Sequence, residues 1–545
     1  MNNNFSPYAS SIYTQKYSRG GTLSWPGLSK LVVESVLSAI GVRPDDTRCT
    51  ELVQLVTDKK FLPAGCYLRA AGRPFHQISN CFSYRVQDSR QGWAEFMRKA
   101  VNSLMTGGGV GAEYSDLREE GAFIKGSGGF ASGPVSVMEM LNECARHIQA
   151  GGSRRAALIA ILRWSHPDIS KFIHKKNWSL EVKEMKEKDY NFPAPLDMTN
   201  ISVRLDQDFF DRYESGDSYS HAIFNDVTYQ MCRTGEPGFT VDLGNEASWI
   251  QRNPCGEATF ENDSGVCNLG SINLARISSL AEMEKAVFLA TLFLFAGSIY
   301  TDTPHEEVKT QIGKQRQLGL GILGMHEWFI QRGYRYGEKS LELDRWMYAY
   351  SQNLSSLRDI WDKCYSMHSF PVKGRAIAPT GTVSSLADTT SGIEPLFCIA
   401  YKRRYLKGTT WMYQYVVDPV AKRMIDGGIP QDNIEDSYLL AQDVERRISF
   451  QSYLQRYVDQ AISSTVNLPR WGSEFNNEKT LIEFRSILMK YLPTLRGITA
   501  YSDGARSGQP LQPVGYKTAM KYLGQDLVEG GTDICELSNR GSCGG

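Results

Sequence analysis

Hydrophobic residues recur along this chain with two spacings, one typical of helices and one typical of strands. After Pro134, apolar side chains fall at helical spacing as far as Gly151, a natural helix stop; they are Val137, Met140, Leu141, Cys144 and Ile148. Leu28–Ile40 is a second amphipathic helix candidate within a mostly helical region at residues 1–80. After Cys81, strand-like runs such as Ile201–Leu205 and Gly238–Asp242 alternate with helices. This alternation predicts an α/β fold.

The longest apolar stretch, Ala286–Ile299, is shorter than a membrane span requires, and it contains Thr291 and Ser298. We therefore predict a buried helix there. At 545 residues and 41% hydrophobic content, the chain is large enough to bury an extensive core. Its formal net charge is zero, so composition implies neither a nucleic-acid nor a membrane partner. We find no internal repeat and no low-complexity segment.

Cysteine usage indicates a reducing compartment. The chain has eleven cysteines, an odd number, and no apolar export segment at its N-terminus. These features favour a cytoplasmic protein with free or catalytic thiols over a structural disulfide framework.

Residues 253–257, Asn-Pro-Cys-Gly-Glu, concentrate reactive groups on a few residues of chain. Alternate side chains of an extended segment point the same way, so Asn253, Cys255 and Glu257 can line one face. That face would combine an amide, a thiol and a carboxylate. Taken alone, the motif is also compatible with a surface loop that carries an ordinary buried cysteine.

Four other cysteines lie at informative positions. Cys81 precedes the motif, and Cys267 follows Cys255 by twelve residues. Cys535 and Cys543 lie in a polar, glycine-rich terminus, which is normally mobile and could bring thiols to a disulfide elsewhere. Two sulfurs are too few for a closed zinc site, and two exposed cysteines without a role are the alternative.

Three glycine-rich segments are candidates for binding an anionic ligand: Gly107–Gly111, Gly151–Arg155 and Ala378–Ser385. Gly151–Arg155 is also cationic, and Ala378–Ser385 adds hydroxyl donors. None matches a P-loop or a dinucleotide fingerprint, and each alone is as compatible with an ordinary turn or a solvated helix end.

Taken together, these residues resemble the catalytic chain of ribonucleotide reductase. The resemblance runs in order from about Tyr17 to the last residues, so it covers nearly the whole chain. Its markers are Asn80-Cys81, Gly107–Gly111, Gly151–Arg155, His166–Ile169, Asn253–Glu257, Ala378–Thr382, Ser391–Pro395 and the cysteine tail.

The resemblance implies a role for each residue of the site. Cys255 matches the cysteine that becomes a thiyl radical and removes the 3′ hydrogen of the substrate ribose. Glu257 matches the base for the 3′ hydroxyl, and Asn253 matches the amide that orients it. Cys81 and Cys267 match the dithiol that supplies two electrons as the 2′ hydroxyl leaves as water. Cys535 and Cys543 match the tail pair that reduces the resulting disulfide, although their spacing is longer than in many family tails.

The resemblance also implies two nucleotide sites. The substrate phosphates would meet Thr380, Gly381 and Thr382, with Asn80 and Gly109 nearby. Deoxynucleotide or ATP effectors would be sensed by the loop of Gly151, Gly152, Ser153, Arg154 and Arg155. Further effector contacts are expected at Asp88, Ser89, Arg90, Arg118 and Lys125, for which ordinary surface charge is the alternative.

Among the family's classes, the sequence favours the adenosylcobalamin-dependent class II. The oxygen-dependent class receives its radical from a separate subunit through two adjacent tyrosines, whereas this chain has Tyr501 followed by Ser502. A chain that needs such a radical-generating subunit remains the alternative. The sequence context of the anaerobic glycyl-radical class is absent.

By resemblance, the fold is a ten-stranded α/β barrel with Cys255 on a loop that threads its centre. We expect residues 1–80 to form a helical N-terminal region without an ATP-cone domain, residues 81–506 the barrel, and residues 507–545 a mobile redox tail. The expected partners are a ribonucleotide diphosphate or triphosphate, thioredoxin or glutaredoxin, and a second copy of the chain.

Two other functions remain open. A nucleotide-binding regulator could keep the fold without the chemistry, although the intact cysteine pairs argue against it. A cysteine-nucleophile transferase or hydrolase would require a histidine base, and none lies close to Cys255 in sequence.

Overall fold

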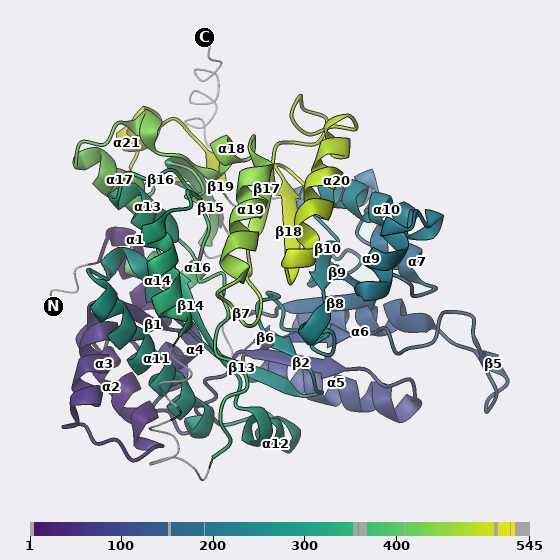
Figure 1. Ribbon diagram of the computed structural model, residues 1–545, viewed down its shortest axis with the longest axis horizontal. Helices are drawn as coiled ribbons and strands as arrows, with labels where there is room; N and C mark the ends of the chain where they lie inside the picture. Colours follow the sequence, from purple (N-terminus) through teal and green to yellow (C-terminus); the bar gives the residue numbers. More distant parts are fainter. Residues whose placement is uncertain are drawn as a thin grey trace.

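A ten-stranded mixed sheet organises the chain in the computed structural model, which describes residues 5–150, 154–189, 191–352, 358, 368–407, 410–505, 511–523 and 525–528 (Figure 1). The strands follow one another in the order β1 (Phe61–Pro63), β13 (Gly265–Asn273), β2 (Cys81–Arg85), β3 (Gly109–Glu113), β8 (Leu158–Arg163), β9 (Thr199–Leu205), β10 (Gly238–Val241), β18 (Gly497–Ser502) and β17 (Thr465–Leu468), with β14 (Leu318–Leu323) paired to β13. The α/β prediction is therefore confirmed.

The sheet has two parallel parts that meet in antiparallel pairs. Strands β2, β3, β8, β9 and β10 are parallel to one another, as are β13 with β14 and β17 with β18. The antiparallel pairs are β1 with β13, β13 with β2, and β10 with β18. Between β14 and the start of β17, single parallel bridges join Leu320 to Arg375 and Ile377 to Ile462. The segment at residues 373–377 thus lies between β14 and the residues just before β17.

Helices cover the outer face of the parallel strands. Those packed on β2 to β10 include α5 (Arg90–Met105), α6 (Gly133–His147) and α10 (Ser218–Thr234). The helix predicted after Pro134 is confirmed, but its buried face is rotated: Val137, Met138 and Leu141 are buried, whereas Met140 is exposed. A period of 3.6 residues admits both stripes, and packing against the sheet selects one of them.

The N-terminal region packs on the other part of the sheet. It contains α1 (Pro7–Lys16), α2 (Trp25–Ser38), α3 (Thr47–Thr57) and α4 (Gly65–Ala70), and its β1 pairs with β13. The predicted buried helix is α11 (Leu280–Tyr300), which packs against α2 and β13 (Figure 1). By length and composition alone α11 could cross a membrane, so our length argument was wrong. However, 72% of its most apolar window is buried in the molecule, as a core helix requires.

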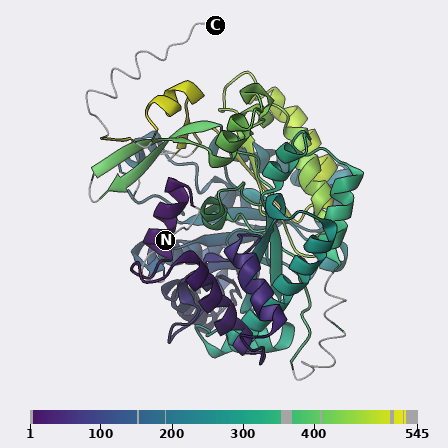
Figure 2. The same cartoon turned by 90° about the vertical axis from the view of Figure 1, so that its left-hand side faces the viewer.

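A second, four-stranded sheet has the order β19 (Leu511–Pro513), β15 (Ala400–Lys407), β16 (Thr410–Val417) and β20 (Asp526–Val528), with α21 (Tyr516–Lys521) beside it (Figure 2). Residues 511–528 were predicted to belong to a mobile tail. They instead complete both edges of the β15–β16 hairpin, because its backbone groups offer pairing partners that composition does not reveal.

Two short hairpins complete the part of the fold that bears on function. One is the arm of β4 (Phe123–Ile124) and β5 (Gly129–Phe130), which extends from the molecule (Figure 1). The other pairs β6 (Gln149–Ala150) with β7 (Arg154–Arg155). The remaining helices are α7 (Ile169–His174), α8 (Leu180–Lys188), α9 (Gln207–Glu214), α12 (Glu306–Gln315), α13 (Met325–Gln331), α14 (Leu341–Ser351), α16 (Gly381–Ala387), α17 (Pro419–Asp426), α18 (Ser437–Leu440), α19 (Val444–Gln455) and α20 (Thr480–Tyr491).

Candidate active site

Cys255 lies at the tip of a hairpin, which we call the finger, formed by β11 (Gln251–Arg252) and β12 (Thr259–Phe260). The tip turns at Gly256, whose φ of +81° favours glycine. Because the tip is a turn and not an extended strand, the three motif residues do not share one environment. Asn253 and Glu257 are buried, whereas the Cys255 side chain is exposed.

Cys81 and Cys267 lie directly opposite each other on the antiparallel strands β2 and β13. Directly opposed Cβ atoms in such a pair are about 4.5–5.5 Å apart, so only a small adjustment would allow a disulfide. Both thiols are free and buried. Burial raises the pKa of both well above the ordinary value, which keeps them protonated at neutral pH.

The finger places its polar side chains against Cys81. Asn253 Nδ2 donates a hydrogen bond to Cys81 Sγ at 3.1 Å, and Asn253 Oδ1 accepts one from the Ala258 amide at 2.9 Å. Glu257 Oε1 lies 4.0 Å from Cys81 Sγ. An amide, a carboxyl group and a redox-capable thiol thus meet at one point, although they are far apart in the sequence.

Glu257 is suited to take up a proton. Burial raises its pKa to about 7, and a hydrogen bond with Asn253 opposes that rise. Its Oε2 is buried and has no hydrogen-bond partner among the residues that the structure describes. An unpaired buried carboxylate oxygen is costly, so this atom indicates a ligand hydroxyl at the site.

Cys255 borders a cavity of about 190 Å³ that is lined largely by β9, β10, β18 and the segment before β17. Asn200, Ser202 and Thr499 contribute polar groups to its wall, and Tyr501 lies on the same wall. The next residue, Ser502, is buried and engaged elsewhere, since it donates to the Cys232 carbonyl and accepts from Asn476 at 2.9 Å. Neighbouring strand residues face opposite ways, so position 502 does not border the Cys255 cavity.

The predicted phosphate segment lies beside a larger cavity of about 1380 Å³. Gly381 and Thr382 line it, while Thr380 is held in a left-handed conformation, and its Oγ1 accepts from the Gly392 amide at 2.8 Å. The cationic residues around the cavity outnumber the acidic ones: Lys16, Arg276, Arg403, Lys422 and Arg423 against Asp388 and Asp426. Ala378, just before this segment, packs in one apolar cluster with Cys81 and Cys267. The cavity can therefore hold an anionic group near the dithiol.

Asn80 and Gly109 are neighbours, but both have structural partners. The Asn80 carbonyl accepts from the Gly109 amide at 2.9 Å, and Asn80 Oδ1 lies 3.5 Å from Cys66 Sγ. A Cβ atom at Gly109 would lie 2.8 Å from Pro254, and one at Gly111 only 1.8 Å from the Arg252 carbonyl. This glycine run therefore allows the finger to approach β3 closely.

The predicted effector residues gather near the start of α5 and on the arm. Arg118 Nε is 2.7 Å from Asp88 Oδ2, Ser89 caps α5, Arg90 is its first residue, and Lys125 follows β4. Arg154 and Arg155 form β7, while Gly151, Gly152 and Ser153 lie outside the described residues, as do Cys535 and Cys543.

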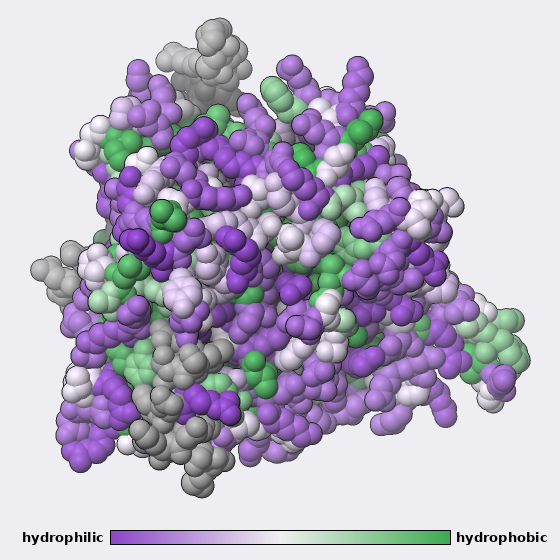
Figure 3. Space-filling view, viewed as in Figure 1, coloured by the Kyte–Doolittle hydropathy of each residue, from purple (hydrophilic) through white to green (hydrophobic). Residues whose placement is uncertain are grey.

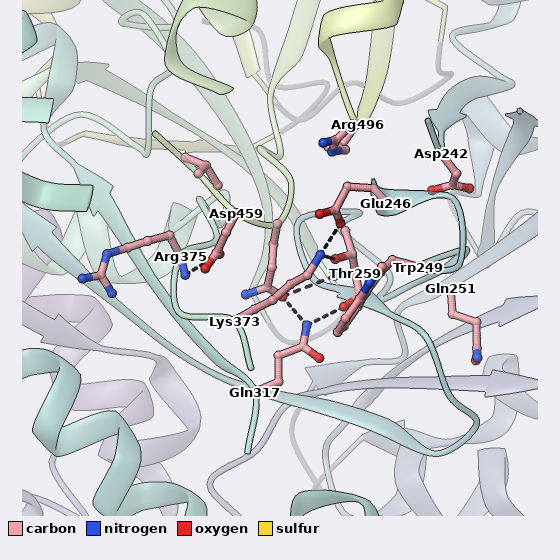
Figure 4. Close-up of polar contacts among 12 residues, drawn as sticks. Asp242, Glu246, Trp249, Gln251, Thr259, Gln317, Lys373, Arg375, Asp459 and Arg496 are labelled. Carbon is pink, nitrogen blue, oxygen red and sulfur yellow. Dashed lines mark hydrogen bonds and ion pairs between the residues drawn. The ribbon is translucent and has the colours of Figure 1, made fainter. Parts of the chain in front are cut away.

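Sequence reasoning missed the residues that hold the base of the finger. Arg252 Nη2 donates to Asp242 Oδ1 at 2.5 Å. Thr259 is bound by Gln460 and, as Figure 4 shows, by Gln317 and Lys373. These residues come from separate segments and form no local motif. Only a polar residue inside an otherwise apolar stretch could have marked them.

Known proteins resemble this chain over most of its length. A family model described as "Ribonucleotide reductase, barrel domain" matches residues 79–222, 219–351 and 373–492. The vitamin B12-dependent ribonucleoside-diphosphate reductase of Mycobacterium tuberculosis (strain CDC 1551 / Oshkosh) is 27% identical over 542 residues, which cover 87% of this chain and 75% of that protein. The protein of the same name from Thermoplasma acidophilum is 27% identical over 522 residues, covering 84% and 65%. A putative adenosylcobalamin-dependent ribonucleoside-triphosphate reductase of Mycobacterium phage D29 is 25% identical over 556 residues, covering 85% and 76%.

Proposed function

The chain belongs to the ribonucleotide reductase family, and from this premise we propose that it reduces ribonucleotides to 2′-deoxyribonucleotides as a class II, adenosylcobalamin-dependent enzyme. One observation carries the proposal: the finger brings Asn253 and Glu257 against Cys81, and Cys81 faces Cys267 across two strands. This arrangement combines a base, an orienting amide and a two-electron donor at one buried point.

Each residue then has a distinct role. The Cys255 thiyl removes the 3′ hydrogen atom of the ribose, and Glu257 Oε2 accepts the proton of the 3′ hydroxyl. Asn253 orients that hydroxyl. The 2′ hydroxyl leaves as water, and Cys81 and Cys267 supply two electrons and two protons as their S–H bonds are replaced by one S–S bond. Cys255 finally returns the hydrogen atom to C3′ and is again a thiyl, and Glu257 returns its proton to the 3′ oxygen.

The residues around Cys255 fit the cofactor named in the relatives. The thiol is exposed to a cavity lined by polar residues, where Asn200, Ser202 and Thr499 would hold part of adenosylcobalamin. When bound, this cofactor supplies the organic radical that oxidises the Cys255 thiol. The single tyrosine at 501, with the buried Ser502 after it, favours this class over a chain that receives its radical through paired tyrosines.

We further propose that the ten strands close into a barrel around the finger. The bridges from Leu320 to Arg375 and from Ile377 to Ile462 support closure between β14 and β17. The substrate phosphates would enter the cationic cavity at Thr380, Gly381 and Thr382, next to the dithiol.

Regulation and turnover would involve further parts of the chain. Exposed Met105, Phe123, Phe130 and Met140, on α5, α6 and the arm, support a homodimer interface beside the proposed effector residues. Hydrophobic surface gathers at the end of the arm, at the right of Figure 3. The pair Cys535 and Cys543 would reduce the Cys81–Cys267 disulfide by thiol exchange, and thioredoxin or glutaredoxin would renew the pair.

The first test is deoxynucleotide formation by the purified chain alone, with dithiothreitol and a matched effector, with and without adenosylcobalamin. Diphosphate and triphosphate substrates are compared in parallel, and Cys255→Ser is the control. Product only in the presence of cofactor is expected. Absence of product from every substrate, with cofactor present, would contradict the proposal and favour a chain that needs a radical-generating subunit.

A further inference from the structure

Three buried side chains from different parts of the chain converge on Thr259, at the base of the finger (Figure 4). Gln460 Oε1 accepts the Thr259 amide hydrogen at 3.3 Å, and Gln317 Nε2 donates to the Thr259 carbonyl. Lys373 Nζ donates to Thr259 Oγ1 at 3.3 Å. Every polar group of this residue is thereby bound by a side chain, which fixes the finger two residues from Glu257.

Gln460 is the centre of this arrangement. Its Oε1 also accepts from Gln317 Nε2 at 2.5 Å, and its Nε2 donates to the Leu318 carbonyl at 2.6 Å. Its own amide donates to the Arg375 carbonyl at 3.1 Å, and the residue is fully buried. Both ends of its side-chain amide are therefore in use, and its backbone is tied to the sheet.

The backbone next to the Gln460 contacts leads to both Glu257 and Cys267. The amide of Ala461, the next residue, donates to the Glu257 carbonyl at 2.9 Å. On the other side, Leu318 is followed by Gly319, where an added Cβ atom would lie 2.8 Å from Cys267 Sγ. Leu318 also pairs with Asn268, the residue after Cys267, on the neighbouring strand β13.

We propose that Gln460 is a positioning residue that fixes two reacting groups at once, the Glu257 carboxylate through the finger and the Cys267 thiol through the backbone of Leu318 and Gly319. This inference rests on the proposed function for its meaning, but its geometry does not depend on turnover.

Gln451 provides a matched control for a purely structural role. It is also a buried glutamine, on α19, and its Nε2 donates to the carbonyl oxygens of Gly497 at 2.9 Å and Ile462 at 3.4 Å. It therefore tethers the sheet backbone as Gln460 does, without bonding to the finger or to Leu318. Methionine replaces either glutamine with similar volume and no amide.

The primary experiment measures the equilibrium between the Cys81–Cys267 dithiol and disulfide in dithiothreitol redox buffers, by peptide mapping of the full chain. Two S–H bonds break and one S–S bond forms, while two electrons and two protons pass to oxidised dithiothreitol. Gln460→Met loses the hydrogen bond that fixes Leu318 beside Cys267, so the paired strands can adjust toward disulfide geometry and the equilibrium should shift toward the disulfide by about three- to tenfold. Gln451→Met should shift it by less than about twofold.

A second measurement tests how Gln460 affects Glu257 on the finger. In Gln460→Met, kcat should fall with KM nearly unchanged, and water admitted to the site should move the acid limb of the pH profile below its wild-type position, because burial is what raises the pKa of Glu257. If the methionine variant folds poorly, Gln460→Asn takes its place. This substitution shortens the side chain by one methylene and should show both effects in weaker form.

The outcomes distinguish the positioning role of Gln460 from the proposed reduction of ribonucleotides. Equal shifts in Gln460→Met and Gln451→Met, or no shift in either, would overturn the positioning role. A disulfide shift confined to the Gln460 variants, in a wild-type chain that forms no deoxynucleotide, would refute the proposed function and retain the placement of Cys267.

Discussion

The finger and the arm are both hairpins with two-residue strands, yet they have opposite surroundings. The finger is buried except at its tip, and Asp242, Gln317, Lys373 and Gln460 bind its base. The arm stands in solvent, with Phe123 58% and Phe130 72% exposed. Isolated two-stranded hairpins are marginally stable, so each needs support from outside itself. The finger has that support within the chain.

The arm has only a small apolar contact of its own. The rings of Phe123 and Phe130 meet edge to face at 6.1 Å between centroids. Exposed aromatic residues of this kind are typical of protein interfaces. The comparison supports both proposals: burial and hydrogen bonding at the finger support its role in the chemistry, and the exposed apolar surface of the arm supports a role in association.

Cys255→Ser is the variant with the largest expected effect, because it removes the only thiol exposed at the finger tip. Deoxynucleotide formation should fall below detection, at least about a thousandfold. The Cys81–Cys267 pair should still oxidise and reduce normally in redox buffers. Residual turnover close to wild type would show that another group initiates the reaction.

Cys81→Ser and Cys267→Ser test the buried strand pair behind the finger. Each leaves one thiol, which cannot supply two electrons by forming an intramolecular disulfide. Multiple turnover should be lost by about a hundredfold or more, although hydrogen abstraction by Cys255 remains possible. Exchange of the 3′ hydrogen with solvent, measured beside product formation, separates the two steps. Intact multiple turnover in Cys81→Ser would refute the assignment of the pair.

The sequence made the chemistry of the finger visible, but not its support. Asn253, Cys255 and Glu257 form a local motif, and strands β9 and β10 were predicted from their own alternation. Gln460 and Lys373 have no such signature, because their importance comes from contacts with a distant Thr259. Polar convergence of this kind is a property of the folded chain.

Two predictions from the sequence, on α6 and on residues 511–528, differ from the structure for the same physical reason. Met140 fits the helical stripe predicted for α6 but is exposed, since packing against the sheet decides which stripe is buried. Residues 511–528 looked like the start of a tail, yet they pair with the open edges of β15 and β16. Periodicity and composition describe local preference, and tertiary partners decide the outcome.

Glu257→Gln tests the protonation state inside the finger site. The base must be ionised, so wild-type kcat/KM should rise about tenfold per pH unit below a pKa of about 7 and level off above it. The variant should lose about a hundred- to ten-thousandfold in rate together with this acid limb. A pH profile that is unchanged in Glu257→Gln would exclude this carboxylate as the base.

The same substitution should change stability with pH in a defined direction. Burial raises the pKa of Glu257 in the folded chain above its unfolded value of about 4.3. Its stabilising contribution is therefore fully present below that unfolded pKa and is lost as the pH rises through about 7. Thermal unfolding should show Glu257→Gln gaining stability relative to wild type between pH 4 and pH 8. An equal difference at both pH values would contradict this linkage.

Phe130→Ser should have the smallest effect on basal activity, because the arm contributes nothing to the finger. Without effector, kcat should stay within about twofold and the unfolding free energy within about 0.5 kcal/mol, as for other exposed positions. Light scattering should instead show a shift from dimer to monomer, and effector-dependent choice between substrates should weaken. Leu341→Ser, at another exposed apolar side chain, is the control and should change neither property. A Phe130→Ser chain that remains dimeric and keeps its effector response would place the interface elsewhere. The finger and the arm would then differ in burial, with no role in association left for the arm.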